Sequence, residues 1–212
     1  MGAGVLARCG GILLGFSAAV WYNGGQENGK EREVMDMTEK KLARQDIYTG
    51  RVVRLHVDTV ELPDGATSLR EIVDHPGGVA ILALDAQCRV PVVRQYRYAF
   101  SRVMREIPAG KREAGEEPFL TARRELKEEV GVTAARWDDL GVLIPSPGCY
   151  GETLYLYLAR ELTRGDTAPD EDEFLECEWM AFDELYRLCM DGTVQDAKTV
   201  AAVLKVKLLL GL

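Results

Sequence analysis

The sequence has few of the side chains that bind metals through nitrogen or sulfur. Its 212 residues include only two histidines, His56 and His75, and neither lies in a ligand-spaced cluster. The five cysteines form no Cys-x-x-Cys pair and are odd in number. This pattern argues against a zinc site or a disulfide framework, and it favours reduced thiols. We therefore expect a cytoplasmic protein whose chemistry does not depend on histidine.

Positive charge is also in the minority. The 26 Lys and Arg are outnumbered by 34 Asp and Glu, which gives a net charge of −8, and no basic stripe is present. This balance disfavours nucleic acid and anionic membranes as partners. A hydrophobic content of 47% and a charged content of 28% are ordinary for a soluble globular protein. The length is enough for one domain with a substantial core.

The apolar run near the start, residues 9–22, has 14 residues. It is shorter than the about 20 residues that a membrane-spanning helix needs. We interpret residues 1–36 as an apolar segment and polar linker that the folded domain, residues 37–212, does not need. The alternatives are a start-site artefact upstream of Met37, a packed helix, and a signal or anchor in residues 1–23. Only an anchor would bring membrane contact.

The most informative segment is residues 110–132, which read GKREAGEEPFLTARRELKEEVGV. Glu125, Glu128 and Glu129 are related by i+3 and i+4, so they share one face of a helix. Like charges packed in this way destabilise a helix unless a cation neutralises them, and Mg²⁺ binds oxygen ligands of this kind. Taken alone, the acidic part is more typical of a solvated charged helix. The complete spacing favours a metal-binding helix.

The surrounding residues predict where this helix begins and ends. Pro118 suits the first helical turn, and Gly131 suits a left-handed C-terminal stop. Gly110 would let the preceding loop approach a ligand closely. An apolar stripe, which we expect opposite the acids, is formed by Phe119, Ala122, Leu126 and Val130.

Residues 110–132 resemble the signature box of the Nudix hydrolases. That family uses Mg²⁺ or Mn²⁺ to hydrolyse a nucleoside diphosphate linked to another moiety. The metal ligands that the resemblance implies are Glu125, Glu128, Glu129 and the backbone carbonyl of Ala109. Arg124 would orient these carboxylates, paired with Glu116 through charge-assisted hydrogen bonds. Mg²⁺ is the expected cofactor, with Mn²⁺ as the alternative.

Segments outside the box resemble the ADP-ribose pyrophosphatase branch over about residues 45–208. Pro147 lies 15 residues beyond the last box residue, Val132, as in that branch. The segments are HPGGVAILALD at 75–85, VVRQYRYAF at 92–100, REIPAGKRE at 105–113, PSPGCYGE at 145–152 and DAKTVAAVL at 196–204. The implied reaction converts ADP-ribose to AMP and ribose 5-phosphate. Another ADP-sugar, NADH or an oxidised nucleotide are alternative substrates, and a non-enzymatic sensor is a further alternative.

The same resemblance implies roles for residues outside the box. Glu173, and after it Glu171, are candidate bases for the attacking water, with Glu128 as their rival. Arg97 is a candidate phosphate contact because its planar fork suits a diphosphate. On the adenosine side the candidates are Glu106 and Arg70, the latter reaching across an interface. The branch forms homodimers that exchange their N-terminal sheets.

The pattern of strands and helices predicts an α/β fold. Residues 47–62 read as one strand and 67–73 as a second, so residues 47–73 form an N-terminal hairpin before a catalytic core at 75–212. Short strands and two C-terminal helices, at about 182–190 and 195–210, follow. Mixed strands with helices predict an α/β/α sandwich. The resemblance implies the Nudix fold, a mixed sheet between helices with a small N-terminal antiparallel sheet.

Overall fold

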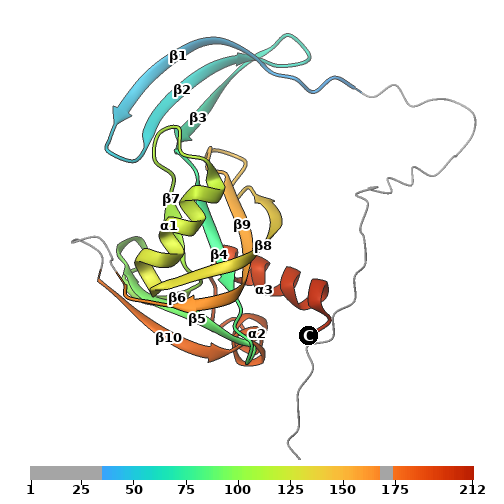
Figure 1. The fold of residues 1–212 in the computed structure, drawn as a ribbon. Helices are drawn as coiled ribbons and strands as arrows, with labels where there is room; N and C mark the ends of the chain where they lie inside the picture. Colours follow the sequence, from blue (N-terminus) through green and yellow to red (C-terminus); the bar gives the residue numbers. More distant parts are fainter. Residues whose placement is uncertain (1–34, 168–173) are drawn as a thin grey trace, which may run out of the picture.

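The computed structural model describes residues 35–167 and 174–212 (Figure 1). The strands are β1 (Lys40–Thr49), β2 (Arg54–Glu61), β3 (Thr67–Asp74), β4 (Gly78–Ala83), β5 (Arg89–Arg97), β6 (Arg102–Glu106), β7 (Ala109–Lys111), β8 (Val132–Leu143), β9 (Leu154–Arg164) and β10 (Leu175–Ala181). The helices are α1 (Pro118–Val130), α2 (Phe182–Met190), α3 (Ala197–Leu210) and the short 3-10 helix η1 (Tyr98–Phe100). Within these ranges, the strands form sheets in the orders β1-β2-β3, β10-β5-β6 and β7-β4-β9-β8.

The small N-terminal antiparallel sheet is present, but it has three strands and not two. The expected single strand over residues 47–62 is wrong, since β1 ends at Thr49 and β2 begins at Arg54. The amide of Gly50 donates a hydrogen bond to the carbonyl of Val53 at 2.9 Å, which closes a turn between them. The run of Val and Thr continues through this turn and hides it. Every residue of β1 is exposed, so this strand lacks an alternating pattern.

Strand β4 lies at the centre of the fold. It pairs antiparallel with β7 and parallel with β9, and all of its residues are buried. Its side chains alternate between the two faces of the sheet. Ala80 and Leu82 join one core with α2 and α3, whereas Val79 and Ile81 join another core that includes residues of α1. The sheet is therefore covered on both faces, which confirms the α/β/α sandwich.

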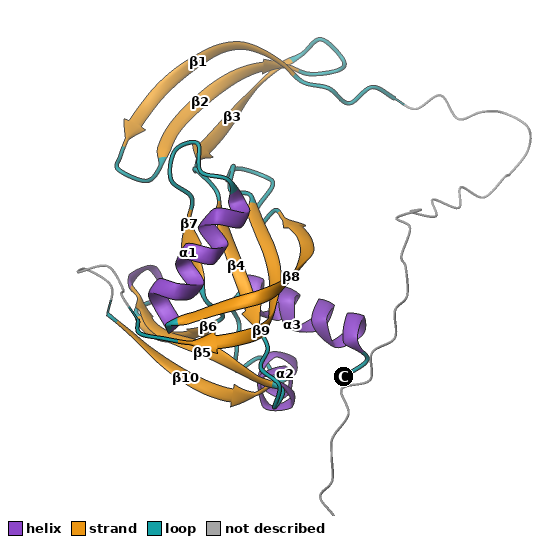
Figure 2. Cartoon of the chain, in the orientation of Figure 1, coloured by secondary structure: helices purple, strands orange, loops and turns teal. Residues whose placement is uncertain are grey.

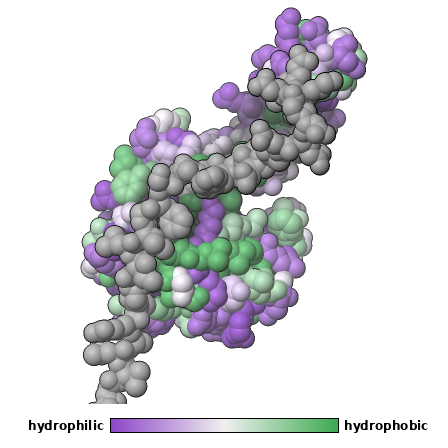
Figure 3. Space-filling view, turned by 90° about the vertical axis from the view of Figure 1, so that its right-hand side faces the viewer, coloured by the Kyte–Doolittle hydropathy of each residue, from purple (hydrophilic) through white to green (hydrophobic). Residues whose placement is uncertain are grey.

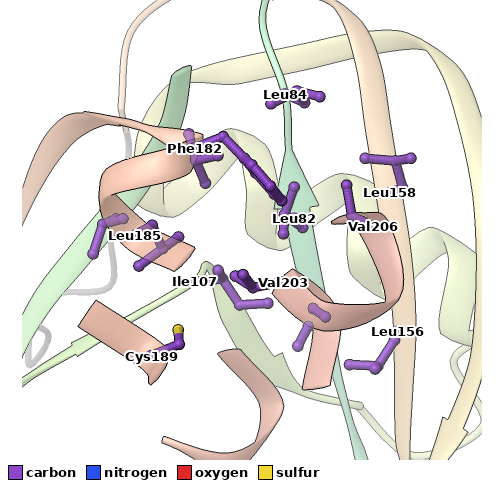
Figure 4. Close-up of a cluster of buried hydrophobic side chains, with 14 of the residues drawn as sticks. Leu82, Leu84, Ile107, Leu156, Leu158, Phe182, Leu185, Cys189, Val203 and Val206 are labelled. Carbon is purple, nitrogen blue, oxygen red and sulfur yellow. The ribbon is translucent and has the colours of Figure 1, made fainter. Parts of the chain in front are cut away.

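The core under α2 and α3 holds this arrangement together (Figure 4). Leu82 of β4 lies among side chains from both helices, including Phe182, Leu185 and Val203. Each of these side chains is at most 2% exposed. Burying one apolar side chain of this size stabilises a fold by about 1.5–3 kcal/mol. These contacts fix α3 against the sheet and so determine where its first residues lie.

The N-terminal sheet stands apart from the three α-helices (Figure 2). Two hydrogen bonds of Val73 help to link this sheet to the rest of the chain. The amide of Val73 donates to the carbonyl of Cys149, and the carbonyl of Val73 accepts from the amide of Gly151, each at 2.8 Å.

On the face of the molecule in Figure 3, hydrophilic and hydrophobic residues are interspersed. Among the described residues, none of the helices combines the length and the hydropathy needed to cross a bilayer.

Candidate active site

Helix α1 carries the acidic residues of the box and buries two of them. Pro118 is its first residue, and Gly131 ends it with a φ of +64°, as expected. The acids do not lie opposite the apolar stripe. Glu125 and Glu129 are only 8% and 5% exposed, and they lie next to stripe residues that are also buried. The helix packs against β7 as well as β4, so both of these carboxylates face protein and not bulk water.

The backbone at the end of β7 approaches these two carboxylates. A Cβ atom added at Gly110 would lie 1.9 Å from Cδ of Glu125, so only glycine fits at this position. The sequence predicted that a loop at Gly110 would approach a ligand; in the structure Gly110 lies in β7 and its backbone approaches Glu125. One residue earlier, the amide of Ala109 donates a hydrogen bond to Oε2 of Glu129 at 2.9 Å. The strand and the helix therefore place a glycine backbone and two buried acids side by side.

Arg124 connects the remaining acids of the site. Its Nε and Nη2 donate to the two carboxylate oxygens of Glu116 at 3.2 and 3.1 Å, so the expected ion pair is present. Its Nη1 lies 2.9 Å from Oε1 of Glu125 and 2.9 Å from Oε2 of Glu128. The hydrogen bonds from Arg124 lower the pKa of Glu116 to about 2. Arg124 thus orients carboxylates on both sides of its guanidinium.

Arg97 and Glu106 form a second ion pair close to the box. Nε and Nη2 of Arg97 donate to the two oxygens of Glu106, each at 2.7 Å. Burial by itself would raise the pKa of Glu106, but hydrogen bonds from Arg97 and the charge of Lys198 outweigh it and lower the pKa to about 2. The hydrogen bond with Glu106 raises the pKa of Arg97, and the charge of Glu129 adds to this effect. Arg97 therefore lies within electrostatic reach of the box.

The acids of the box have the donor chemistry of a divalent cation site. Within residues 35–167 and 174–212, no three His, Cys, Asp or Glu side chains already converge on one cation position. Arg124 engages Glu125 and Glu128 in this arrangement. The residues nevertheless fit a cation, because Mg²⁺ prefers oxygen ligands. Here these are the carboxylates of α1 and the backbone carbonyls of the neighbouring strand β7. Carboxylates crowded on one helix also repel one another, and a bound cation would offset that repulsion.

Two family comparisons divide the chain at the last residue of β3, Asp74. Residues 74–203 match the NUDIX domain, and residues 39–73 match the N-terminal domain of nucleoside diphosphate sugar hydrolases. The chain belongs to the Nudix hydrolase family. Its sheet and helices are therefore the Nudix fold, and α1 is its Nudix helix.

Relatives of this Nudix hydrolase match it over most of its length. It is 43% identical to the methanol dehydrogenase activator of Bacillus methanolicus, over 78% of this chain and 90% of that protein. The ADP-ribose pyrophosphatase of Bacillus subtilis (strain 168) is 42% identical, over 79% and 91%. The ADP-ribose pyrophosphatase of Mycobacterium tuberculosis is 38% identical, over 78% and 81%. A crystal structure of an ADP compounds hydrolase shares the fold, with a TM-score of 0.72 at 21% identity, over 82% of this chain and 94% of that chain.

Sequence reasoning missed the residues that hold Glu106 from the far side of the Nudix fold. Lys198, at the start of α3, donates to Oε2 of Glu106 and, at 2.8 Å, to Oδ1 of Asp196. Asp196 caps α3 by accepting from the amide of Thr199 at 3.0 Å. The hydroxyl of Thr199 in turn accepts from the amide of Ile107 at 2.9 Å. The sequence pattern of an N-cap before an apolar run could have predicted the role of Asp196. No pattern predicts that Lys198 pairs with a residue 92 positions away.

The other predicted site residues lie apart from the Nudix helix or outside the described residues. Arg70 is on β3, where its Nε donates to Glu39 at 2.9 Å. Glu171 and Glu173 lie outside the described residues. The chain before them leaves the sheet beside the end of α1, where Gly165 donates to the carbonyl of Gly131 at 2.6 Å. The chain after them enters β10, whose first residue, Leu175, pairs with Gln95 of β5.

Proposed function

We propose that this Nudix hydrolase is a metal-dependent ADP-ribose diphosphatase that produces AMP and ribose 5-phosphate. The observation that carries the proposal is the pair of buried carboxylates, Glu125 and Glu129, against the backbone of residues 109–110, with Arg97 in electrostatic reach. With a divalent cation held by these carboxylates, such a site would suit a substrate whose own charge is negative and compact. Two relatives of 42% and 38% identity that bear the name ADP-ribose pyrophosphatase support the choice of diphosphate.

In this proposal Glu125, Glu128, Glu129 and the carbonyl of Ala109 would hold Mg²⁺, or alternatively Mn²⁺. When bound, such a cation offsets phosphate charge and lowers the pKa of a coordinated water. The protein's own contribution is orientation. The amide of Ala109 fixes one oxygen of Glu129, and Arg124 fixes Glu125 and Glu128. Pre-oriented groups avoid reorganisation when charge develops in the transition state.

Arg97 would contact the diphosphate in this proposal. Its side chain is 39% exposed although two of its nitrogens already contact Glu106. A guanidinium can therefore keep one edge on a buried carboxylate while another edge faces a phosphate oxygen. Glu106 would then act on the substrate chiefly through Arg97, and its proposed adenosine contact would have to compete with that pair.

The base that takes the proton from the attacking water is proposed to be Glu173, with Glu171 as the second candidate and Glu128 as the rival. A base acts in the transition state, so its loss lowers kcat and changes KM little. We expect Glu173→Gln to lower kcat strongly and Glu171→Gln to do much less, measured as initial rates across pH at saturating Mg²⁺. Normal turnover by Glu173→Gln would pass the role to Glu171 or, if both variants are active, to Glu128.

We further propose a cytoplasmic homodimer that exchanges N-terminal sheets. In the single chain, Tyr48 and Leu69 of this sheet are 60% and 64% exposed. Exposed apolar side chains of this size are typical of surfaces that a partner covers. Arg70 lies on the same sheet, away from the box of its own chain. An exchange would bring it toward the adenosine side of the partner's site.

A second candidate substrate is NADH, whose diphosphate links two nucleosides. It offers the same carboxylates a diphosphate that carries adenosine on one side, as ADP-ribose does. ADP-ribose and NADH both place a diphosphate at the same carboxylates. They differ only in the group on the far side of the diphosphate.

One experiment separates these candidates. The protein is incubated with Mg²⁺ and, separately, ADP-ribose, NADH, another ADP-sugar, GDP-mannose or an oxidised nucleotide, and the products are identified by mass. We expect AMP and ribose 5-phosphate from ADP-ribose, with the highest kcat/KM of the panel. A higher kcat/KM for NADH would replace ADP-ribose as the substrate. Absence of turnover across the panel, at any tested Mg²⁺ or Mn²⁺ concentration, would overturn the enzymatic proposal.

A further inference from the structure

Lys198 lies at the centre of a charged cluster behind the Nudix helix. Its side chain is only 12% exposed, and the carboxylates of Glu106 and Asp196 that it contacts are 5% and 13% exposed. Arg97 contacts the same Glu106 through Nε and Nη2, and its Nη2 shares Oε2 of Glu106 with Lys198. One buried carboxylate therefore has two cationic partners, which come from β5 and α3.

The cluster holds two cations and two carboxylates, but the two carboxylates are engaged differently. The carboxylate of Asp196 also accepts from the amide and the hydroxyl of Thr199, so the N-terminus of α3 offsets part of its charge. Glu106 carries one negative charge, which Arg97 and Lys198 share. Without Lys198, the two-pronged pair with Glu106 would neutralise Arg97. With Lys198, the single charge of Glu106 is divided between two cations, so Glu106 neutralises Arg97 less completely.

Arg97 also keeps a nitrogen available for a ligand. Its Nε and Nη2 are the atoms that contact Glu106, and Nη1 has no hydrogen-bond partner within the described parts of the chain. We propose that Lys198 is a positioning residue: by sharing the charge of Glu106, it leaves Arg97 able to bind a phosphate oxygen of the substrate. This inference rests on the proposed function, because it takes Arg97 as the phosphate contact.

A purely structural role for Lys198 predicts something different. The same contacts fasten the first turn of α3 to β6, so loss of the lysine could loosen that junction. A looser junction would lower stability and impair the site whether or not Arg97 is present. A role through Arg97 disappears once Arg97 itself has been removed. A double-mutant cycle separates the two, because residues that act through one another are not additive.

The cycle compares wild type, Lys198→Met, Arg97→Met and the double variant, using KM and kcat on whichever nucleoside diphosphate the panel turns over best. We expect Lys198→Met to raise KM about tenfold with kcat within about threefold, as for a lost ground-state contact. In the Arg97→Met background the same change should raise KM less than about threefold, because the group through which Lys198 acts is gone. Lys198→Arg, which keeps the charge, should recover most of the wild-type KM.

Two outcomes would overturn the proposal. One is an equal rise of KM from Lys198→Met with and without Arg97, and the other is an unchanged KM in the wild-type background. Melting temperatures are measured for all variants, and Lys198→Gln replaces Lys198→Met in the cycle if the latter does not fold. The cycle is read on the best substrate of the panel. A failure of ADP-ribose as the substrate is therefore seen in the panel and does not decide the cycle.

Discussion

The N-terminal sheet and the central sheet solve the problem of exposed strands in different ways. Strand β4 of the central sheet is buried on both faces by helices, whereas all ten residues of β1 are exposed. The N-terminal sheet instead gathers charge on one face. A cavity of about 360 Å³ there is lined by Arg44, Asp46, Thr49, Arg54, His56 and Asp74. His56 is 2% exposed, and its Nε2 has no hydrogen-bond partner among the described residues.

This difference shows which region is complete in a single chain. The central sheet is buried by helices of the same chain, and the box acids are contacted by Arg124 and by the amide of Ala109. The proposed metal ligands are therefore oriented without a second copy. The N-terminal sheet leaves apolar side chains such as Tyr48 and Leu69 exposed. It also buries the imidazole of His56 beside the charged cavity. Its stability is therefore expected to depend on a partner, and that of the core is not.

The largest expected effect is on the core side of this comparison. We expect Glu129→Gln to lower kcat by about two orders of magnitude or more, as does the loss of other strong electrostatic contributors. The amide can still accept the hydrogen bond from Ala109, so the fold should persist. Initial rates at saturating Mg²⁺ test this, with circular dichroism as a check of folding. The matched control is Glu178→Gln in β10, which removes a carboxylate paired with Arg105 of β6 and should leave the protein fully active.

A pair of leucine variants compares the packing of the two sheets directly. Leu82→Ala, in β4, should lower the free energy of unfolding by about 2–5 kcal/mol, because a fully buried side chain leaves a cavity. Leu69→Ala, in β3, should cost less than about 0.5 kcal/mol in a monomer, because its side chain is 64% exposed. Denaturant titrations measure both. A large cost for Leu69→Ala that falls on dilution would show that a second copy covers this residue.

Acid titration offers a comparison of two arginine–carboxylate pairs. The folded-state pKa of Glu106 is about 2, below its ordinary value of 4.5. Its ionised form therefore stabilises the fold above pH 4.5, and this stabilisation is lost as the pH falls from 4.5 toward 2. Glu106→Gln should flatten the stability profile over that range, followed by tryptophan fluorescence in urea. A profile as steep as that of wild type would contradict the assignment.

The matched change in the N-terminal sheet is Asp58→Asn. Both carboxylates are held by two nitrogens of one arginine, and the hydrogen bond from Arg44 lowers the pKa of Asp58. Lys198 gives Glu106 a second cation, and Asp58 lies in the sheet that stands apart from the α-helices. We therefore expect Asp58→Asn to flatten the profile less than Glu106→Gln does.

The smallest expected effect concerns the first residues of the chain. A chain that begins at Met37 should fold and keep wild-type kcat and KM, because every proposed site residue lies beyond it. Residues 1–34 lie outside the described residues, so the dispensable-segment interpretation stays a prediction. The test is the yield of soluble protein and the initial rate on the best substrate. Aggregation or loss of activity would place the boundary of the folded domain earlier.

Sequence reasoning worked best where local chemistry determines the structure. Pro118 and Gly131 fixed the limits of α1, and the resemblance to the signature box implied the pair of Arg124 with Glu116, which is present. It failed at β1, because a polar exposed strand has no alternating pattern to read. It also placed the acids of α1 on the wrong side of the helix. The spacing itself puts Glu125 three residues from Ala122 and Glu129 three residues from Leu126, so these two acids adjoin the apolar stripe. Their contacts with the backbone of β7 were not readable from the sequence.

The parallel pairing of β4 with β9 has a consequence for the order of folding. It joins Gly78 to Leu154, so the chain must close a loop of about 76 residues before the central sheet exists. Contacts of such sequence separation form slowly compared with helices and hairpins. Lys198 reaches Glu106 only after α3 has been synthesised, 92 positions later. During synthesis on the ribosome, the carboxylate of Glu106 therefore stays solvated, without Lys198, until almost the whole protein has emerged.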